Sequence, residues 1–161
     1  MEAFHTLAEI SVAIAGFSSL VIVFRGRIAD WQGQDFISLA FALSWSIGAV
    51  FFSLFPIVVG EFGYRLIEIA RVGLFLLAAY MIFAGAFLQY SRRRLQPVEG
   101  AASPLSPSLS ILYGVIVVGA ISAGLGLFPG AVNGWYAAAI TLLLAHATGE
   151  LVLLVINAVR R

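Results

Sequence analysis

Five apolar runs, each long enough to cross a lipid bilayer, divide the sequence between short polar breaks. They cover approximately residues 4–24, 36–59, 66–90, 109–128 and 135–159, and a helix needs about 20 apolar residues to span the hydrocarbon core. In lipid, a spanning segment must satisfy its own backbone hydrogen bonds, which favours a helix for each separate run. The sequence therefore predicts an all-α, polytopic integral membrane helical bundle of about five transmembrane helices.

The composition agrees with this class and argues against several others. The chain is 61% hydrophobic and 11% charged, and a soluble domain carries about a quarter charged residues. We expect one transmembrane domain over residues 1–161, because the connections are too short to hold a second. The net charge of +1 argues against a nucleic-acid partner. Cysteine and lysine are both absent, which excludes thiolate metal sites and Schiff-base chemistry. We expect no enzyme activity, no catalytic residue, no cofactor and no metal.

The arginines predict the orientation, because cytoplasmic loops carry an excess of positive charge. With five spans, seven arginines fall on one side, namely Arg25, Arg27, Arg92, Arg93, Arg94, Arg160 and Arg161. Only Arg65 and Arg71 fall on the other. We therefore expect an N-terminus outside the cell, a cytoplasmic C-terminus and a proline-rich cytoplasmic loop at 91–108. The apolar N-terminal stretch is typical of small bacterial multi-pass proteins, which points to the bacterial inner membrane.

A polar stripe on the fifth run is the strongest candidate for chemistry. His146, Glu150 and Asn157 are four and seven residues apart, which places them in a narrow arc of one helix. An ionisable side chain at a membrane helix centre costs about 2.5–3.5 kcal/mol, so the stripe must face protein or water. The His–Glu pair suits a proton relay or a cation site. The alternative is a structural clasp of interhelical hydrogen bonds.

Depth matching suggests which side chains support this stripe. Counting about 1.5 Å per residue along each predicted span places Ser44, Trp45 and Ser46 near the depth of Glu150. The same count places Tyr80 near His146, close to the middle of the membrane. We expect these residues to hydrogen-bond the pair if their helices are neighbours.

A second polar pair, His5 and Glu9, lies near the start of the first run. The carboxylate is favoured there by the helix dipole and by headgroup water. The sharper alternative is a ring of Glu9 side chains that attracts cations at the mouth of an oligomeric pore. A metal site shared with Glu150 is not expected, because the two carboxylates differ in predicted depth by roughly 13 Å.

Small residues on two of the runs let helix backbones approach closely. They are Ser11, Ala15 and Ser19 on the first run, and Gly119, Ala120, Ala123 and Gly124 on the fourth. The pattern indicates either tight packing within one chain or contact with a second subunit.

These patterns leave two main hypotheses for function. The first is an oligomeric channel or transporter that conducts protons or cations through its intramembrane Glu and His side chains. The alternative is a non-catalytic structural or assembly subunit of a larger membrane complex. The expected partners are the lipid bilayer and either further copies of the chain or other membrane subunits.

Overall fold

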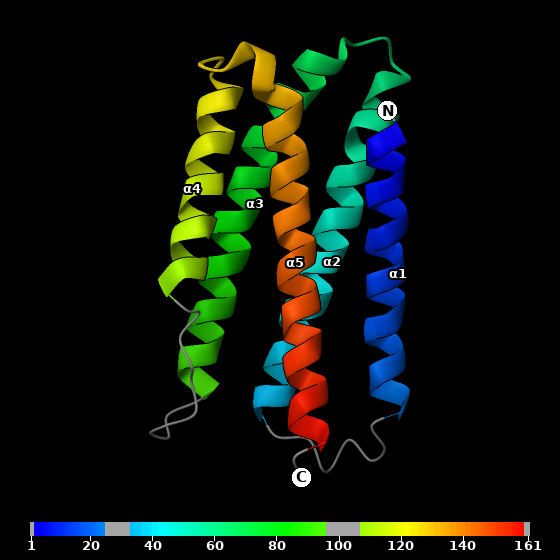
Figure 1. The fold of residues 1–161 in the computed structure, drawn as a ribbon, viewed down its shortest axis with the longest axis vertical. Coiled ribbons are helices and arrows are strands. Elements are labelled where there is room, and N and C mark those ends of the chain that lie inside the picture. Colours follow the sequence, from blue (N-terminus) through cyan, green and yellow to red (C-terminus); the bar gives the residue numbers. More distant parts are fainter. Residues whose placement is uncertain (1, 25–32, 96–106, 160–161) are drawn as a thin grey trace.

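The computed structural model describes residues 2–24, 33–95 and 107–159, and these residues form five α-helices and one short 3-10 helix (Figure 1). The helices are α1 (Glu2–Phe24), α2 (Gly33–Gly60), α3 (Leu66–Leu95), α4 (Pro107–Gly124) and α5 (Val132–Val159), with η2 (Pro129–Ala131) before α5. Successive α-helices run in opposite directions, so α1, α3 and α5 all end at the same end of the bundle (Figure 1). The predicted all-helical class is confirmed.

Three of the helices are long and apolar enough to cross a membrane. Their apolar segments are Asp35–Gly60 in α2, Leu66–Phe87 in α3 and Val132–Ile156 in α5. The apolar segments described in α1 and α4 are shorter, at His5–Phe17 and Tyr113–Gly124. Their length and apolar composition are therefore those of an integral membrane protein with three helices that could span the bilayer.

α2 and α5 form the middle of the bundle. α2 packs against α1, α3 and α5, whereas α5 contacts all four other α-helices. α1 flanks this pair at one edge, and α4 lies toward the opposite edge beside α3 (Figure 1). Side chains near the middle of α5 therefore meet residues from several helices at once.

Glycines bring the helices close together by accommodating aromatic rings of neighbouring helices. A Cβ atom built on any of three glycines would lie 2.2–2.6 Å from a ring atom, which is closer than real contacts allow. The pairs are Gly48 with Tyr80 between α2 and α3, Gly73 with Tyr136 between α3 and α5, and Gly119 with Trp135 between α4 and α5. Each helix contact thus depends on a missing side chain on one partner.

One of these rings, that of Tyr136, also supplies a hydrogen bond that the backbone of α2 lacks. Pro56 lies inside α2 and has no N–H, so it cannot bond the carbonyl of Phe52 four residues earlier. The buried hydroxyl of Tyr136 donates to that carbonyl oxygen at 2.7 Å. A side chain from α5 therefore replaces the missing helical hydrogen bond, which is one way that membrane helices tolerate proline.

Several helix ends differ from the predicted boundaries. α3 continues to Leu95, beyond the predicted stop at Tyr90, because arginine is a good helix former outside the apolar core. Of the predicted loop at 91–108, residues 91–95 are helical in α3 and residues 107–108 are helical in α4. Residues 96–106 lie outside the described residues. α5 begins at Val132 rather than near Trp135.

α4 ends at Gly124, before the predicted Phe128, because the chain turns at Gly126. This glycine has a φ of 85°, a left-handed conformation that a side chain disfavours. Two backbone bonds close the turn, from the Gly126 N–H to the Ala123 carbonyl at 3.0 Å and from the Leu127 N–H to the Ser122 carbonyl at 3.1 Å. This pattern is a glycine-dependent helix C-cap.

Replacing Gly126 with alanine is expected to lower the free energy of unfolding by about 1 kcal/mol, because alanine is strained at positive φ. Thermal unfolding of the purified protein in detergent micelles measures the effect. Gly130→Ala is the matched control in the same connection, since Gly130 has no positive φ and an added Cβ would meet nothing within 4 Å. Equal melting temperatures for the two variants would contradict the strain argument.

Candidate polar site

α5 presents two titratable side chains to the bundle interior from one face. His146 and Glu150 are four residues apart, which places them on adjacent turns of the same side of the helix. Glu150 is only 8% exposed, and His146 is half-buried. The polar face predicted for α5 is therefore turned toward protein at both of these positions.

Two aromatic rings from other helices lie beside the imidazole, and a third ring lies beside one of them. The ring centroid of Trp45 on α2 lies 6.0 Å from that of His146, and Tyr113 on α4 lies 5.8 Å from it. The ring centroid of Trp45 also lies 6.1 Å from that of Tyr113 and 6.0 Å from that of Tyr80 on α3. We call Trp45, Tyr80, Tyr113 and His146 the aromatic cluster. It takes one residue from each of α2, α3, α4 and α5.

The hydrogen bond of His146 defines which of its nitrogens is available. Nδ1 lies 3.0 Å from the carbonyl oxygen of Leu142. Because a carbonyl only accepts, this bond places a proton on Nδ1, and Nε2 of the neutral ring then carries a lone pair. Nε2 is buried and has no hydrogen-bond partner within the described part of the chain. It is therefore an available proton acceptor inside the bundle.

The two tyrosine hydroxyls are held by backbone carbonyls on neighbouring helices. Tyr80 donates to the carbonyl of Ser44 at 2.5 Å, and the Ser44 hydroxyl lies 3.1 Å from the same phenol oxygen. Tyr113 donates to the carbonyl of Met81. Since each phenol proton is directed at a carbonyl, each phenol oxygen presents lone pairs to its remaining surroundings. These bonds link α3 to α2 and α4 to α3.

The tryptophan at the centre of the aromatic cluster leaves a buried donor unused. Trp45 is only 2% exposed, and its indole Nε1 has no hydrogen-bond partner among the described residues. The neighbouring Ser46 is fully buried, and its hydroxyl also lacks such a bond. Buried polar groups normally pair with protein or with ordered water, so each of these two groups is open to a further hydrogen bond.

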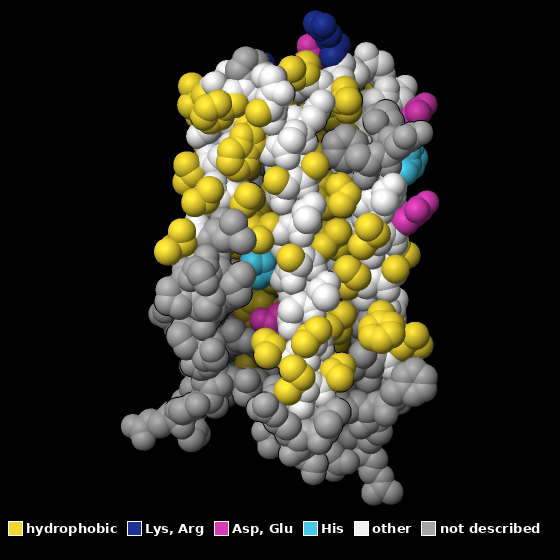
Figure 2. All heavy atoms as spheres, viewed as in Figure 1, with side chains coloured by type: hydrophobic (Ala, Val, Ile, Leu, Met, Phe, Trp, Pro, Cys, Tyr) yellow, Lys and Arg dark blue, Asp and Glu magenta, His cyan; other side chains and the backbone are white. Residues whose placement is uncertain are grey.

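Part of the polar site is visible from outside the bundle, since His146 is half-buried. Figure 2 shows a histidine and an acidic side chain recessed between neighbouring helices on this face.

The first-helix pair has a different environment. His5 and Glu9 are both exposed on α1. Figure 2 shows acidic and histidine side chains along the edge of the molecule where α1 lies, away from the recessed pair. The two predicted polar pairs are thus separate features, one facing outward and one facing inward.

The predicted small-residue faces pack mainly within the chain. Ser11 is fully buried and donates to the carbonyl of Leu7 at 2.5 Å, and Ala15 is half-buried. On α4, Ala120 and Ala123 are fully buried. Gly119 lies against Trp135, as described above, and Gly124 lies against Phe75 of α3. The side chains of Ser19 and Asn157 lie outside the described residues.

Within the described residues, no group of three or more His, Cys, Asp or Glu side chains is placed to hold a metal ion. No known protein family, curated protein or solved structure matches the chain. The site therefore has to be interpreted from its own geometry.

Tyr113 is the member of the site that sequence reasoning missed. It lies near the start of the apolar part of α4, where it resembles an ordinary interfacial aromatic residue. A signal was present, because a phenol inside an apolar run needs a hydrogen-bond partner. Only the packing of α4 against α3 shows that this partner is the Met81 carbonyl.

Proposed function

We propose that this chain is a small multi-pass membrane protein that transfers protons or a small cation across the bilayer, with His146 and Glu150 as the titratable pair. The chain crosses the membrane five times in this proposal, with the N-terminus outside and the C-terminus in the cytoplasm. The arginine distribution and the alternating helix directions support that arrangement (Figure 1).

The observation that carries the proposal is the placement of a carboxylate and an imidazole on one inward face of a membrane-spanning helix. Ionisable groups are expensive inside a membrane, and they typically mark ion or proton pathways. A structural clasp would use its polar atoms in direct hydrogen bonds. The buried Nε2 of His146 and Nε1 of Trp45 make none within the described structure, which favours a site that exchanges protons or binds water.

Further buried hydroxyls on α2 extend this polar character along the bundle. Ser46 and Ser53 are both fully buried, and neither hydroxyl has a hydrogen-bond partner among the described residues. They are seven residues apart, which corresponds to about 10 Å along the helix. Both lie about 80–100° around α2 from Trp45, so they are buried polar groups on a second face of that helix.

Flux through liposomes reconstituted with the purified protein tests the proposal. Wild type is expected to dissipate a pH gradient, and Glu150→Gln is expected to slow this by about 100-fold, because the amide keeps the shape but cannot accept a proton. Glu9→Gln is the matched control. It makes the same change at an exposed carboxylate of α1 and is expected to leave the flux unchanged.

The other outcomes separate the alternatives. Loss of flux in Glu9→Gln alone would indicate that a ring of Glu9 side chains in an oligomer conducts the ion, and not His146 and Glu150. Absence of flux in wild type, with all three proteins folded, would contradict conduction. That result would favour a structural or assembly subunit in which His146 and Glu150 hold the helices together.

A further inference from the structure

The lone pairs that a site offers at one time decide whether it suits a proton or a metal cation. A proton needs a single lone pair, whereas Mg²⁺ and Ca²⁺ take about six or more oxygen ligands together. A potassium channel likewise replaces the hydration shell of its ion with rings of backbone carbonyl oxygens. The acceptors around His146 therefore indicate which ion the site can handle.

The backbone carbonyls bonded by the aromatic cluster have their lone pairs in use. Each of three carbonyl oxygens receives a side-chain hydrogen bond from a residue of the cluster. They are the carbonyls of Ser44, Met81 and Leu142, bonded by Tyr80, Tyr113 and His146 respectively. Each carbonyl also lies inside an α-helix, where it accepts the N–H of the residue four positions on. Since a carbonyl oxygen has two lone pairs, these three oxygens have none left for a cation.

The side chains at the imidazole offer few ligands and one opposing hydrogen. The acceptors described there are Nε2 of His146 and the phenol oxygen of Tyr113, with Glu150 one helix turn away. The indole of Trp45, with its centroid 6.0 Å from that of the imidazole, adds a buried N–H that has no hydrogen-bond partner in the described chain. The positive end of an N–H dipole repels a bare cation. This set is too small for a metal ion, but it includes the one lone pair that a proton needs.

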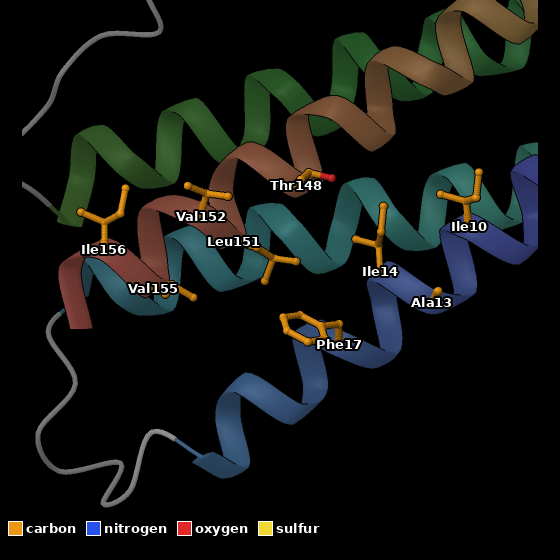
Figure 3. Close-up of a pocket in the computed structure, with 9 residues that line it drawn as sticks. All are labelled: Ile10, Ala13, Ile14, Phe17, Thr148, Leu151, Val152, Val155 and Ile156. Carbon is orange, nitrogen blue, oxygen red and sulfur yellow. The ribbon is translucent and has the colours of Figure 1, made fainter. Parts of the chain in front are cut away.

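The opposite side of α5 adds no ligand to this set. Thr148 is two residues from both His146 and Glu150, so it faces away from them. Its hydroxyl donates to the carbonyl of Leu144 at 2.9 Å, and the other residues that line the space between α1 and α5 are apolar (Figure 3). This side of α5 therefore gives an ion no polar ligand that is not already bonded.

We propose that the transferred ion is the proton, that Nε2 of His146 is the atom that accepts it, and that metal cations are excluded. The Nε2 lone pair forms an N–H bond with the incoming proton, and the ring becomes an imidazolium while Nδ1 keeps its own proton on the Leu142 carbonyl. The new N–H bond breaks as the proton passes to the Glu150 carboxylate, and the ring is neutral again. Release of the proton from the Glu150 carboxylic acid to bulk water restores the carboxylate. This inference rests on the proposed function and narrows it from protons or small cations to protons.

Ion flux into liposomes that contain the full-length protein tests this selectivity. Wild type is expected to pass protons, reported by an internal pH-sensitive dye, and to take up radioactive sodium and rubidium ions no faster than protein-free liposomes. His146→Asn is expected to slow proton flux by about 100-fold, because the amide can still donate to the Leu142 carbonyl but provides no Nε2. His5→Asn is the matched control, since it makes the same change at an exposed histidine of α1 and is expected to conduct like wild type.

The outcomes distinguish this inference from the function on which it rests. Sodium or rubidium flux as fast as proton flux would overturn the inference and leave the proposed function standing. Unchanged proton flux in a folded His146→Asn protein, together with loss of flux in Glu150→Gln, would also overturn the inference alone. Absence of every ion flux in wild type would overturn both.

Nitrogen NMR of the His5→Asn protein tests the inference even if His146→Asn does not fold. The sequence contains two histidines, so isotope-labelled histidine in this variant reports on His146 alone. The neutral ring is expected to show a protonated Nδ1 and an unprotonated Nε2, and acidification is expected to protonate Nε2. Sodium or potassium chloride added at constant pH is expected to leave both signals unchanged. A shift of the Nε2 signal with either salt, or a protonated Nε2 in the neutral ring, would overturn the inference.

Discussion

Gly73→Ala is expected to lower the free energy of unfolding by about 1–3 kcal/mol, although alanine is intrinsically the better helix former. The new methyl carbon would lie 2.6 Å from Cε2 and 3.0 Å from the hydroxyl oxygen of Tyr136. That ring cannot move away cheaply, because it is fully buried and its hydroxyl is bonded to the Phe52 carbonyl. The methyl group must therefore push α3 and α5 apart or break the bond.

Gly114→Ala is the matched control for this prediction. Gly114 lies inside α4, and nothing lies within 4 Å of its Cβ position, so alanine there is expected to stabilise the protein by up to about 1 kcal/mol through helix propensity. Unfolding by sodium dodecyl sulfate in mixed micelles gives both values. The two substitutions are chemically identical and should change stability in opposite directions. A change of the same sign in both would show that close packing of Tyr136 on Gly73 does not limit the contact.

Tyr136→Phe is expected to cost about 1–3 kcal/mol, because it leaves a buried carbonyl without a hydrogen-bond partner. The carbonyl is that of Phe52, whose usual helical partner is absent because residue 56 is proline. Tyr64→Phe is the control at an exposed position, where the same loss of a hydroxyl should change stability by less than about 0.5 kcal/mol. The same unfolding titration measures both.

Pro56→Ala provides the decisive comparison, because alanine restores the N–H that the Phe52 carbonyl lacks. In this background Tyr136→Phe is expected to cost less, with a coupling free energy between the two positions of about 1 kcal/mol. A double-mutant cycle over Pro56 and Tyr136 measures that coupling. An identical cost of Tyr136→Phe in both backgrounds would show that the hydroxyl does not compensate for the proline.

Much of the helical architecture was predictable from the apolar runs. A segment in lipid must satisfy its backbone hydrogen bonds locally, so a run of sufficient length predicts a helix without knowledge of its neighbours. The predicted runs at 36–59 and 66–90 correspond to α2 and α3, and the run at 135–159 corresponds to α5. The errors occur at the helix ends. Local backbone geometry at Gly126 ends α4 early, and helix-forming arginines extend α3.

The polar site was partly visible in the sequence. The i, i+4 spacing of His146 and Glu150 identifies a shared face of one helix, and ionisable side chains stand out in an apolar segment. Counting residues along each predicted span placed Trp45 near the depth of Glu150 and Tyr80 near the depth of His146. It could not distinguish Trp45, which contacts His146, from Tyr80, which bonds Ser44 instead. It also missed Tyr113, because depth alone does not show which helices are neighbours.

The sequence by itself determined the elements that depend on local chemistry: the helices, the class of membrane protein, the polar face of α5 and the proline that removes one backbone hydrogen bond from α2. Only the tertiary structure decided which helix faces meet. Tyr136 packs on Gly73 and bonds the Phe52 carbonyl, and Trp45 contacts His146, through residues far apart in the chain. The physical reason is that lipid is as apolar as the side chains facing it, so hydrophobicity does not mark the inward face of a membrane helix. Close packing and interhelical hydrogen bonds select that face, and both require the partner helix to be in place.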